Sequence, residues 1–167
     1  TGQKTGWFFD HRENRARAAS FAASRRVLDV YSYLGGFGLT SAAAGANDIL
    51  CIDRSAPALE IAAQAASEAG YADICRFEKA EAFDALEGLA KDGEKFGVVI
   101  ADPPAFVKSR KDLKPGARGY RKLARLSSSL VEPGGILSIA SCSHHMDVAV
   151  FAEQVRRGLK DSGRAGR

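Results

Sequence analysis

The sequence has no apolar run long enough to cross a membrane. Its longest hydrophobic stretches, such as residues 97–101, fall far short of the roughly 20 residues that a spanning helix needs. The first residues also lack the charged start, apolar stretch and small-residue cleavage site of a secretory signal. We therefore expect a cytoplasmic protein with no membrane partner.

Cysteine is scarce, and its spacing excludes two common roles. The three cysteines stand at positions 51, 75 and 142, with no C-x-x-C pair and no disulfide-framework spacing. We expect reduced thiols and no bound metal. Cys51 and Cys75 lie within apolar strand patterns, where cysteine is usually buried. Only Cys142 therefore needs a functional explanation.

The chain also lacks internal repeats and low-complexity linkers, and its 167 residues suit one globular domain. After residue 159 too little sequence follows for another strand pair, so we expect the domain to be a piece of a longer protein. The net charge of +4 is concentrated at residues 12–26 and 108–125. These basic segments favour a polyanionic partner, but a charge run taken alone is more often a solvated face.

Short β-branched runs alternate with alanine-rich amphipathic stretches along the chain, which is typical of βαβ units. The pattern predicts a Rossmann-like α/β fold, a mostly parallel, doubly wound sheet with helices on both faces. The loop at 103–116 is expected to lack secondary structure. Gly45, Gly70 and Gly134 are predicted to end helices. Strands are predicted at 26–30, 47–52, 72–77, 97–101 and 135–140, and helices at 14–24, 38–46, 56–69, 82–91, 117–131 and 147–160.

A glycine-rich turn follows the first predicted strand. Gly35, Gly36 and Gly38 permit a sharp turn and a close approach of the backbone to a ligand, next to the free N–H groups of a helix. The spacing matches neither G-x-G-x-x-G nor the P-loop pattern. The turn therefore indicates a ligand site without naming the ligand.

Acidic residues end the next two strands. Asp53 follows Asp29 by 24 positions, near the spacing at which an acid reaches ribose hydroxyls, and Glu81 is placed to accept an adenine amine beside Ala82. Asp53 could instead cap the helix that begins near Ser55. The combination of glycine turn and acids favours a nucleoside pocket.

The segment Asp-Pro-Pro-Ala-Phe at 102–106 is the most specific in the chain. Pro103 and Pro104 cannot donate hydrogen bonds and fix an extended turn, so Asp102 is presented rigidly at a strand end. Such a carboxylate can bind a base amino group while Phe106 stacks on its ring. A rigid turn with a helix-capping aspartate is the alternative.

Cys142 follows the last predicted strand within Ser-Cys-Ser-His-His. It can be a nucleophile, a buried bystander or a metal ligand, and the adjacent His144 and His145 suit metal binding poorly because their side chains point apart. As a nucleophile the thiolate would act beside Asp102, which follows the neighbouring strand. The thiol needs activation for this, because its ordinary pKa is about 8.5.

In this order of motifs the chain resembles the class I S-adenosylmethionine-dependent methyltransferases. Its Lys-Thr-Gly-x-x-x-Asp-x-Arg segment at 4–12 and Ser141-Cys-Ser143 are similar to the bacterial 23S ribosomal RNA cytosine-C5 methyltransferases related to large-subunit methyltransferase I. The resemblance covers essentially the whole chain, residues 1–167, as the methyltransferase domain. The family normally carries an N-terminal PUA domain, a linking domain and a final strand pair, which we expect to lie outside this chain.

The resemblance implies a reaction, a cofactor and a set of site residues. The reaction is methyl transfer from S-adenosylmethionine to C5 of a cytosine in 23S ribosomal RNA, through a covalent Cys142 adduct. Asp102 faces both the methyl group and the base, and Pro103, Pro104, Phe106 and Lys108 contact the RNA. The cofactor contacts are Asp10, Arg12, Asp29, Tyr31, Gly35, Gly36, Asp53, Arg54, Glu81, Ala82 and Asp102.

Three points stay open at the level of sequence. Many RNA cytosine methyltransferases place a second cysteine after the proline of the strand-four motif, but here that region reads Asp-Pro-Pro-Ala-Phe. The base that removes the C5 proton is therefore unassigned among His144, Asp102 and water. The same fold could instead methylate an adenine or guanine amine, or bind nucleotides or RNA without catalysis. Association into a homodimer is also left open.

Overall fold

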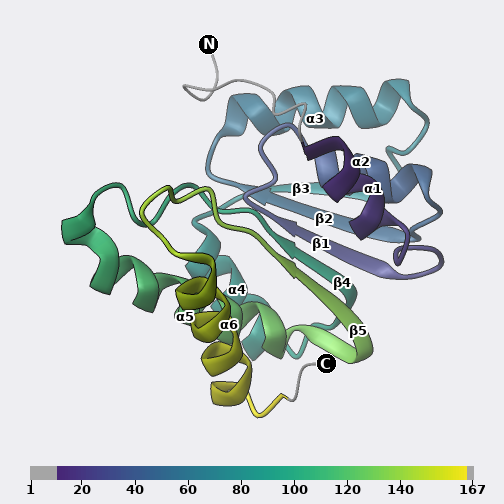
Figure 1. Ribbon diagram of the computed structural model, residues 1–167. Coiled ribbons are helices and arrows are strands. Elements are labelled where there is room, and N and C mark those ends of the chain that lie inside the picture. Colours follow the sequence, from purple (N-terminus) through teal and green to yellow (C-terminus); the bar gives the residue numbers. More distant parts are fainter. Residues whose placement is uncertain (1–10, 165–167) are drawn as a thin grey trace.

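Five strands form one sheet in the order β3-β2-β1-β4-β5 (Figure 1). The computed structural model describes residues 11–164, and all four strand pairs within them are parallel. The strands are β1 (Arg26–Val30), β2 (Asp48–Asp53), β3 (Cys75–Lys79), β4 (Phe96–Ala101) and β5 (Val131–Ile139).

Helices cover both faces of this sheet. Figure 1 shows α1 (Arg12–Ala19), α2 (Gly36–Ala43) and α3 (Ala56–Glu68) on one face. The other face carries α4 (Ala82–Lys91), α5 (Leu113–Ser129) and α6 (Val148–Asp161), with the 3₁₀ turn η2 (Arg110–Asp112) before α5. The doubly wound α/β fold expected from the sequence is therefore confirmed.

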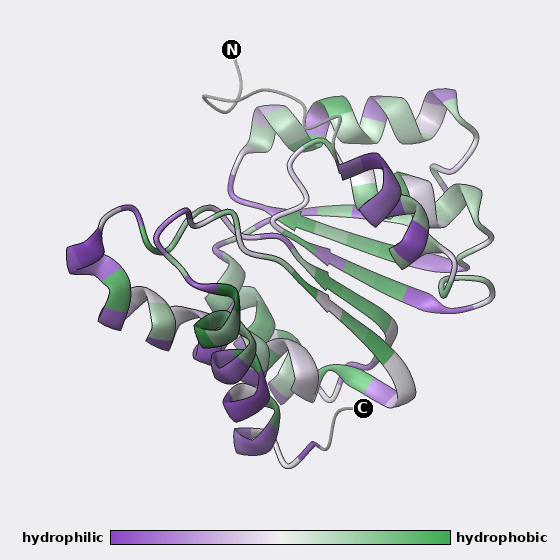
Figure 2. Ribbon diagram, in the orientation of Figure 1, coloured by the Kyte–Doolittle hydropathy of each residue, from purple (hydrophilic) through white to green (hydrophobic). Residues whose placement is uncertain are grey.

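Alternating strand residues supply two separate cores. Leu28, Val30 and Ile52 face α4 and α5, whereas Val27 and Ile49 face α1, α2 and α3. Figure 2 shows the strands in green between helices whose outer surfaces carry most of the purple. Burial of both strand faces explains why the strands are near-continuous apolar runs.

Several predicted boundaries were wrong, and the largest error concerns the segment 103–116. It is not structureless, because η2 and the first turn of α5 lie within it. Pro115 is accepted there since the first turn of a helix needs no N–H donor from it. Gly134 does not end a helix either; it lies inside β5 with φ 74°.

The second helix begins at Gly36 rather than 38, and β3 begins at Cys75 rather than 72. The turn at Tyr71 to Ile74 takes the first predicted strand residues, since Cys75 N–H donates to the carbonyl of Tyr71. β5 begins four residues before its predicted start, at Val131. These shifts leave the strand ends that carry the site residues in place.

The chain reverses its direction of winding between β1 and β4. β1 lies between β2 and β4: the chain runs outward from β1 through β2 to β3, then crosses back to β4 on the other side of β1 and continues to β5. In open α/β sheets ligands bind at the carboxyl ends of the strands at this switch point. Among residues 11–164 no helix has both the length and the apolar character needed to cross a membrane.

Candidate active site

The turn after β1 is held in an unusual conformation. Tyr31, Tyr33 and Gly35 have positive φ angles of 64°, 50° and 70°, and two of them are not glycine. Such angles are costly for tyrosine and cluster at functional sites. The turn leads directly into α2, whose N-cap residue is Gly35.

Asp29 fixes this turn from below. Its Oδ2 accepts a hydrogen bond from the N–H of Gly38 at 2.9 Å, while its Oδ1 is buried without a partner within the described residues. Burial is the main cause that raises the pKa of Asp29 to about 7. The hydrogen bond from Gly38 opposes this rise, and the charges of Asp102 and Asp53 add to it. A buried acceptor with no donor marks a place for a ligand donor.

The raised pKa of Asp29 predicts how stability depends on pH. From about pH 4 to pH 7 the unfolded chain loses this proton while the folded chain keeps it, so the free energy of unfolding should fall as pH rises. Each pKa unit corresponds to about 1.4 kcal/mol. Asp29→Asn keeps an acceptor for Gly38 but cannot ionise, so it should match the wild type at pH 4 and exceed it by a few kcal/mol at pH 8.

Urea unfolding of both proteins across this range measures the difference directly. The comparison cancels groups such as Asp48, whose lowered pKa, offset in part by burial, reflects its bonds with Arg26 and Arg76 and acts in the opposite direction. Parallel stability curves for the two proteins would show that Asp29 does not carry the effect.

Asp53 ends β2, and its carboxylate serves two turns. Oδ2 accepts from the N–H of Tyr33 at 2.9 Å and Oδ1 accepts from the N–H of Ser55 at 2.8 Å. Ser55, not Asp53, caps α3, since its side chain accepts from the N–H of Ala58. The capping alternative for Asp53 was therefore wrong, and the carboxylate instead joins the turn after β1 to the turn after β2.

The remaining predicted cofactor residues occupy the same sheet edge with different exposure. Glu81 is exposed at the start of α4, Ala82 is buried behind it, and Arg54 is exposed. Arg12 is the exposed first residue of α1, and Asp10 lies outside the described residues. Glu81 and Asp53 add to the burial that raises the pKa of Tyr31 to about 12, so these acids surround the turn.

Asp102 stands where β4 ends, beside β1. Its N–H donates to the carbonyl of Val30 at 3.4 Å, and its Oδ2 lies 3.4 Å from His11 Nδ1. Pro103 is buried and Pro104 is exposed, so the backbone leaves the sheet in a fixed direction. The contact with His11 was not predicted, because nothing in the sequence places α1 beside β4.

The sequence predicted that the Phe106 ring is presented to a substrate base, but in the structure it is only partly presented. Its ring lies 4.7 Å from that of Tyr120, 6.1 Å from Phe83 and 6.5 Å from Tyr31, measured between centroids. The ring is half-buried in this aromatic group. Lys108, two residues on, is exposed and has no hydrogen bond among residues 11–164.

Cys142 follows β5, the neighbour of β4. Its thiol donates to the carbonyl of Pro103 at 3.7 Å and the residue is exposed. Partial burial raises the pKa of Cys142, and the charge of Asp102 raises it further. The described residues therefore bring Cys142 and Asp102 together, but they keep the thiol protonated. His144 and His145 are also exposed.

Tyr120 is a site residue that the sequence did not reveal. Its hydroxyl accepts from Ser141 Oγ and lies 2.8 Å from Ser143 Oγ, which accepts from the N–H of Val107. Tyr120 is fully buried in α5, so it joins the loop after β4 to the loop after β5. A tyrosine on the apolar face of a helix is the only sequence signal, since a buried hydroxyl needs partners.

Tyr120→Phe should lower the free energy of unfolding by about 1–3 kcal/mol, because two hydroxyls lose a buried partner. It should also make Cys142 react faster with iodoacetamide, since the Ser-Cys-Ser loop loses its anchor. Ser128→Ala is the matched control, because it removes a hydroxyl of α5 that bonds away from the site. Equal alkylation rates in all three proteins would contradict this role for Tyr120.

Three carboxylates thus face one another at the switch point. Asp102 and Asp53 both disfavour the charge on Asp29, and Asp102 disfavours a thiolate at Cys142. A cation between them would relieve this repulsion. Among residues 11–164 no three His, Cys, Asp or Glu side chains are grouped so as to hold a metal ion.

The family model of the S-adenosylmethionine-dependent methyltransferases matches residues 1–157. The chain belongs to this family. S-adenosylmethionine, the cofactor of these enzymes, carries two cationic groups, a sulfonium and an ammonium. The methyltransferase therefore has its acidic cluster at the edge of the sheet where the fold class binds ligands.

Curated relatives match almost the whole of this chain but less than half of their own length. "Ribosomal RNA large subunit methyltransferase I" of Aeromonas salmonicida (strain A449) is 37% identical over 98% of this chain and 41% of its own length. The protein of the same name from Tolumonas auensis (strain DSM 9187 / NBRC 110442 / TA 4) is 38% identical with the same coverage. The chain thus spans about two fifths of the length of these relatives.

Solved structures share the fold. A SAM-dependent methyltransferase from Streptococcus mutans superposes with a TM-score of 0.79 at 25% identity, over 92% of this chain and 40% of that one. A methyltransferase solved in complex with SAH has a TM-score of 0.80 at 24% identity, over 92% of this chain and 41% of that one. The Rossmann-like methyltransferase fold is confirmed.

Proposed function

We propose that the chain transfers a methyl group from S-adenosylmethionine to C5 of a cytosine in 23S ribosomal RNA. The juxtaposition of Cys142 and Asp102 carries this proposal. The two residues follow neighbouring strands, the thiol contacts the Pro103 carbonyl, and the Asp102 charge acts on the thiol. The named relatives support RNA as the substrate class.

The residues present fit the cofactor. The unpartnered Oδ1 of Asp29 can accept a donor such as an ammonium. Gly38 lets the start of α2 pack closely on β2, since a Cβ there would lie 2.5 Å from Cys51 Sγ, and its N–H holds Asp29 in place. Asp53 keeps lone pairs beyond its two N–H bonds, which suits ribose hydroxyls, and the exposed Glu81 can accept the adenine amine. When bound, the cofactor supplies an electrophilic methyl group.

Cys142 and Asp102 divide the work on the base. The Cys142 thiolate forms a bond to C6, and the electron pair of the C5–C6 double bond then becomes available at C5 for the methyl group. Asp102 binds the N3 and N4 edge of the ring. Afterwards the C5 proton passes to a base, the double bond reforms and the C6–S bond breaks.

The raised pKa of Cys142 sets a condition for this chemistry. The thiol ionises readily only when the charge of Asp102 is offset. A cationic cofactor and a hydrogen bond that Asp102 accepts from the amino group of the base both provide such an offset. We therefore propose that Cys142 is activated in the complex with cofactor and RNA and not in the free protein.

The same raised pKa favours a second candidate, methylation of an adenine or guanine amine. In that reaction Asp102 would bind the amine at the end of β4, as its rigid Asp-Pro-Pro context allows, and a protonated Cys142 would be a bystander. No covalent adduct would form, which separates the two candidates by experiment.

Product analysis tests the proposal. The chain is incubated with S-adenosylmethionine and 23S ribosomal RNA from cells that lack the protein, and the RNA is digested to nucleosides and mapped by mass spectrometry. The proposed function requires 5-methylcytidine at one position. N-methyladenosine or N-methylguanosine would establish the second candidate, and unmethylated RNA would refute both for this chain.

A further inference from the structure

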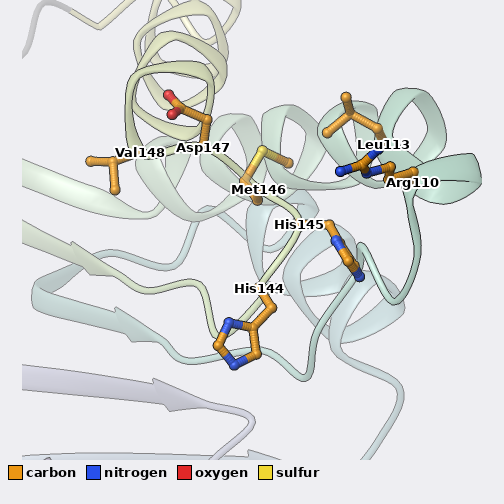
Figure 3. Close-up of a pocket in the computed structure, with 7 residues that line it drawn as sticks. All are labelled: Arg110, Leu113, His144, His145, Met146, Asp147 and Val148. Atoms are coloured by element: carbon orange, nitrogen blue, oxygen red, sulfur yellow. The ribbon is translucent and has the colours of Figure 1, made fainter.

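A groove of about 630 Å³ lies between the loop after β5 and the start of α5 (Figure 3). It begins two residues beyond Cys142. In Figure 3, His144 is turned toward the strand ends, and His145 is turned away from it toward the loop that leads to Arg110. Its lining includes Arg110, Leu113, His144, His145, Met146 and Val148.

The groove has exposed apolar side chains at both of its ends. Leu113, beside Arg110, is 38% exposed, and Val148, at the opposite end, is 80% exposed (Figure 3). Val150, in the same turn of α6 as Val148 but outside the groove lining, is 38% exposed. Phe21 and Ile61 are the only other large hydrophobic side chains exposed among residues 11–164. Grouped apolar side chains at a surface mark binding sites more often than single ones do.

The end of the groove at Leu113 is also cationic (Figure 3). Arg110 has no hydrogen bond or ion pair within the described part of the chain, and residues 108–114 carry four Lys or Arg and one Asp. Both nearby acids are engaged locally: Asp112 accepts from Ser109 at 2.8 Å, and Asp147 caps α6 by accepting from the N–H of Ala149 at 2.8 Å. The positive charge of Arg110 is therefore left for a ligand.

We infer that this groove binds the nucleotide adjacent to the target base in a single RNA strand, its base against Leu113 and Val148 and its phosphate at Arg110. The inference rests on the proposed RNA substrate and adds a site to it. An unstacked nucleotide offers a flat apolar ring beside an anion. The ring matches the exposed apolar side chains of the groove, and the anion matches Arg110. The hollow between α5 and α6 is a poorer match, because its Arg121 is already paired with Asp161 at 2.6 Å.

A salt titration tests the cationic end. The probe is a short single-stranded RNA with one central cytosine, and its binding to the chain is measured by fluorescence anisotropy without S-adenosylmethionine. Arg110→Gln should lower the slope of log affinity against log salt by about 0.7, the value for one phosphate contact to a single strand. Lys91→Gln at the far end of α4 is the matched control and should leave the slope unchanged.

Abasic RNA tests the apolar side chains. Removing the base next to the cytosine, on each side in turn, should weaken binding to the wild type about 3- to 10-fold on one side, on the order of a stacking contact. The double variant Leu113→Ser, Val148→Ser should bind intact RNA as weakly and lose nothing further on abasic RNA. Ile61→Ser, an exposed apolar residue of α3, should retain the full abasic effect.

An unchanged salt slope in Arg110→Gln, or an abasic effect as large in the double variant as in the wild type, would overturn the groove assignment. The outcome is separate from that of the proposed reaction, because binding is read without methyl transfer. Methylation at an atom other than C5 would refute the proposed chemistry and leave the groove in place. Normal C5 methylation by both groove variants, with unaltered RNA binding, would do the reverse.

Discussion

Cys142→Ala is expected to reduce methyl transfer to C5 of cytosine by about 10³-fold or more, because no other thiol can form the C6 adduct. Cys51 and Cys75 are buried within β2 and β3 on a different part of the sheet. The cofactor affinity should not change, since within residues 11–164 the Cys142 side chain makes its one hydrogen bond to the Pro103 carbonyl. The loss should therefore lie in kcat.

Single-turnover transfer of a radiolabelled methyl group measures this effect, and calorimetry measures cofactor binding in the same variants. Cys75→Ala is the matched control: it removes a thiol whose pKa is also raised by burial but which lies on β3, away from Asp102, and it should retain turnover. The exposure of Cys142 makes a folding defect in Cys142→Ala an unsuitable explanation for lost activity.

RNA containing 5-fluorocytidine gives an independent reading. Fluorine at C5 cannot leave as a proton does, so the methylated adduct should persist as a complex of RNA and protein that survives denaturation. Wild type and Cys75→Ala should form this complex, and Cys142→Ala should not. Full methyl transfer by Cys142→Ala would eliminate the adduct mechanism and favour amine methylation.

The location of the candidate site residues at the strand ends could be predicted from the sequence, because parallel strands bring their carboxyl ends to one edge of the sheet. β-branched runs located the strands, and motif order then placed Asp29, Asp53, Asp102 and Cys142 at that edge, where the structure has them. A shift of a few residues in a strand start, as in β3, does not move its carboxyl end.

Contacts between elements distant in sequence could not be predicted. Tyr120 lies 21 and 23 residues before the serines that it binds, and nothing in the local pattern of α5 specifies that pairing. The same holds for the contact of His11 with Asp102. Such contacts depend on how helices pack over the sheet, which periodicity alone leaves undetermined.

Glycines in α5 misled the helix boundary for a related reason. We predicted a loop that ends at Gly116, yet Gly116 lies in the helix, where Phe106 and Val107 pack directly against it. Gly119, inside the predicted helix, is likewise packed against Phe106. A Cβ at Gly116 would lie 2.7 Å from the carbonyl oxygen of Phe106. The helix thus loses some intrinsic propensity so that the Asp-Pro-Pro-Ala-Phe loop can approach it closely.

Gly38→Ala is expected to lower the free energy of unfolding by about 1–3 kcal/mol, although alanine favours a helix more than glycine does. An alanine Cβ at this position would lie 2.5 Å from Cys51 Sγ and 3.2 Å from Ile49 Cγ2, both of them wholly buried. The start of α2 must then shift, and its N–H bond to Asp29 with it. Cofactor affinity should fall together with stability.

A double-mutant cycle identifies the clash as the cause. Cys51→Ala removes the sulfur, so in the Gly38→Ala background it should restore much of the lost stability instead of adding to the loss. Gly88→Ala is the matched control, since no atom lies within 4 Å of its Cβ position inside α4, and it should raise stability by about 0.5–1 kcal/mol. Urea unfolding at one pH measures the four proteins of the cycle and the Gly88→Ala control. Strict additivity of Gly38→Ala and Cys51→Ala would mean that α2 meets no steric limit at Gly38, and the contact with Cys51 would not explain the glycine there.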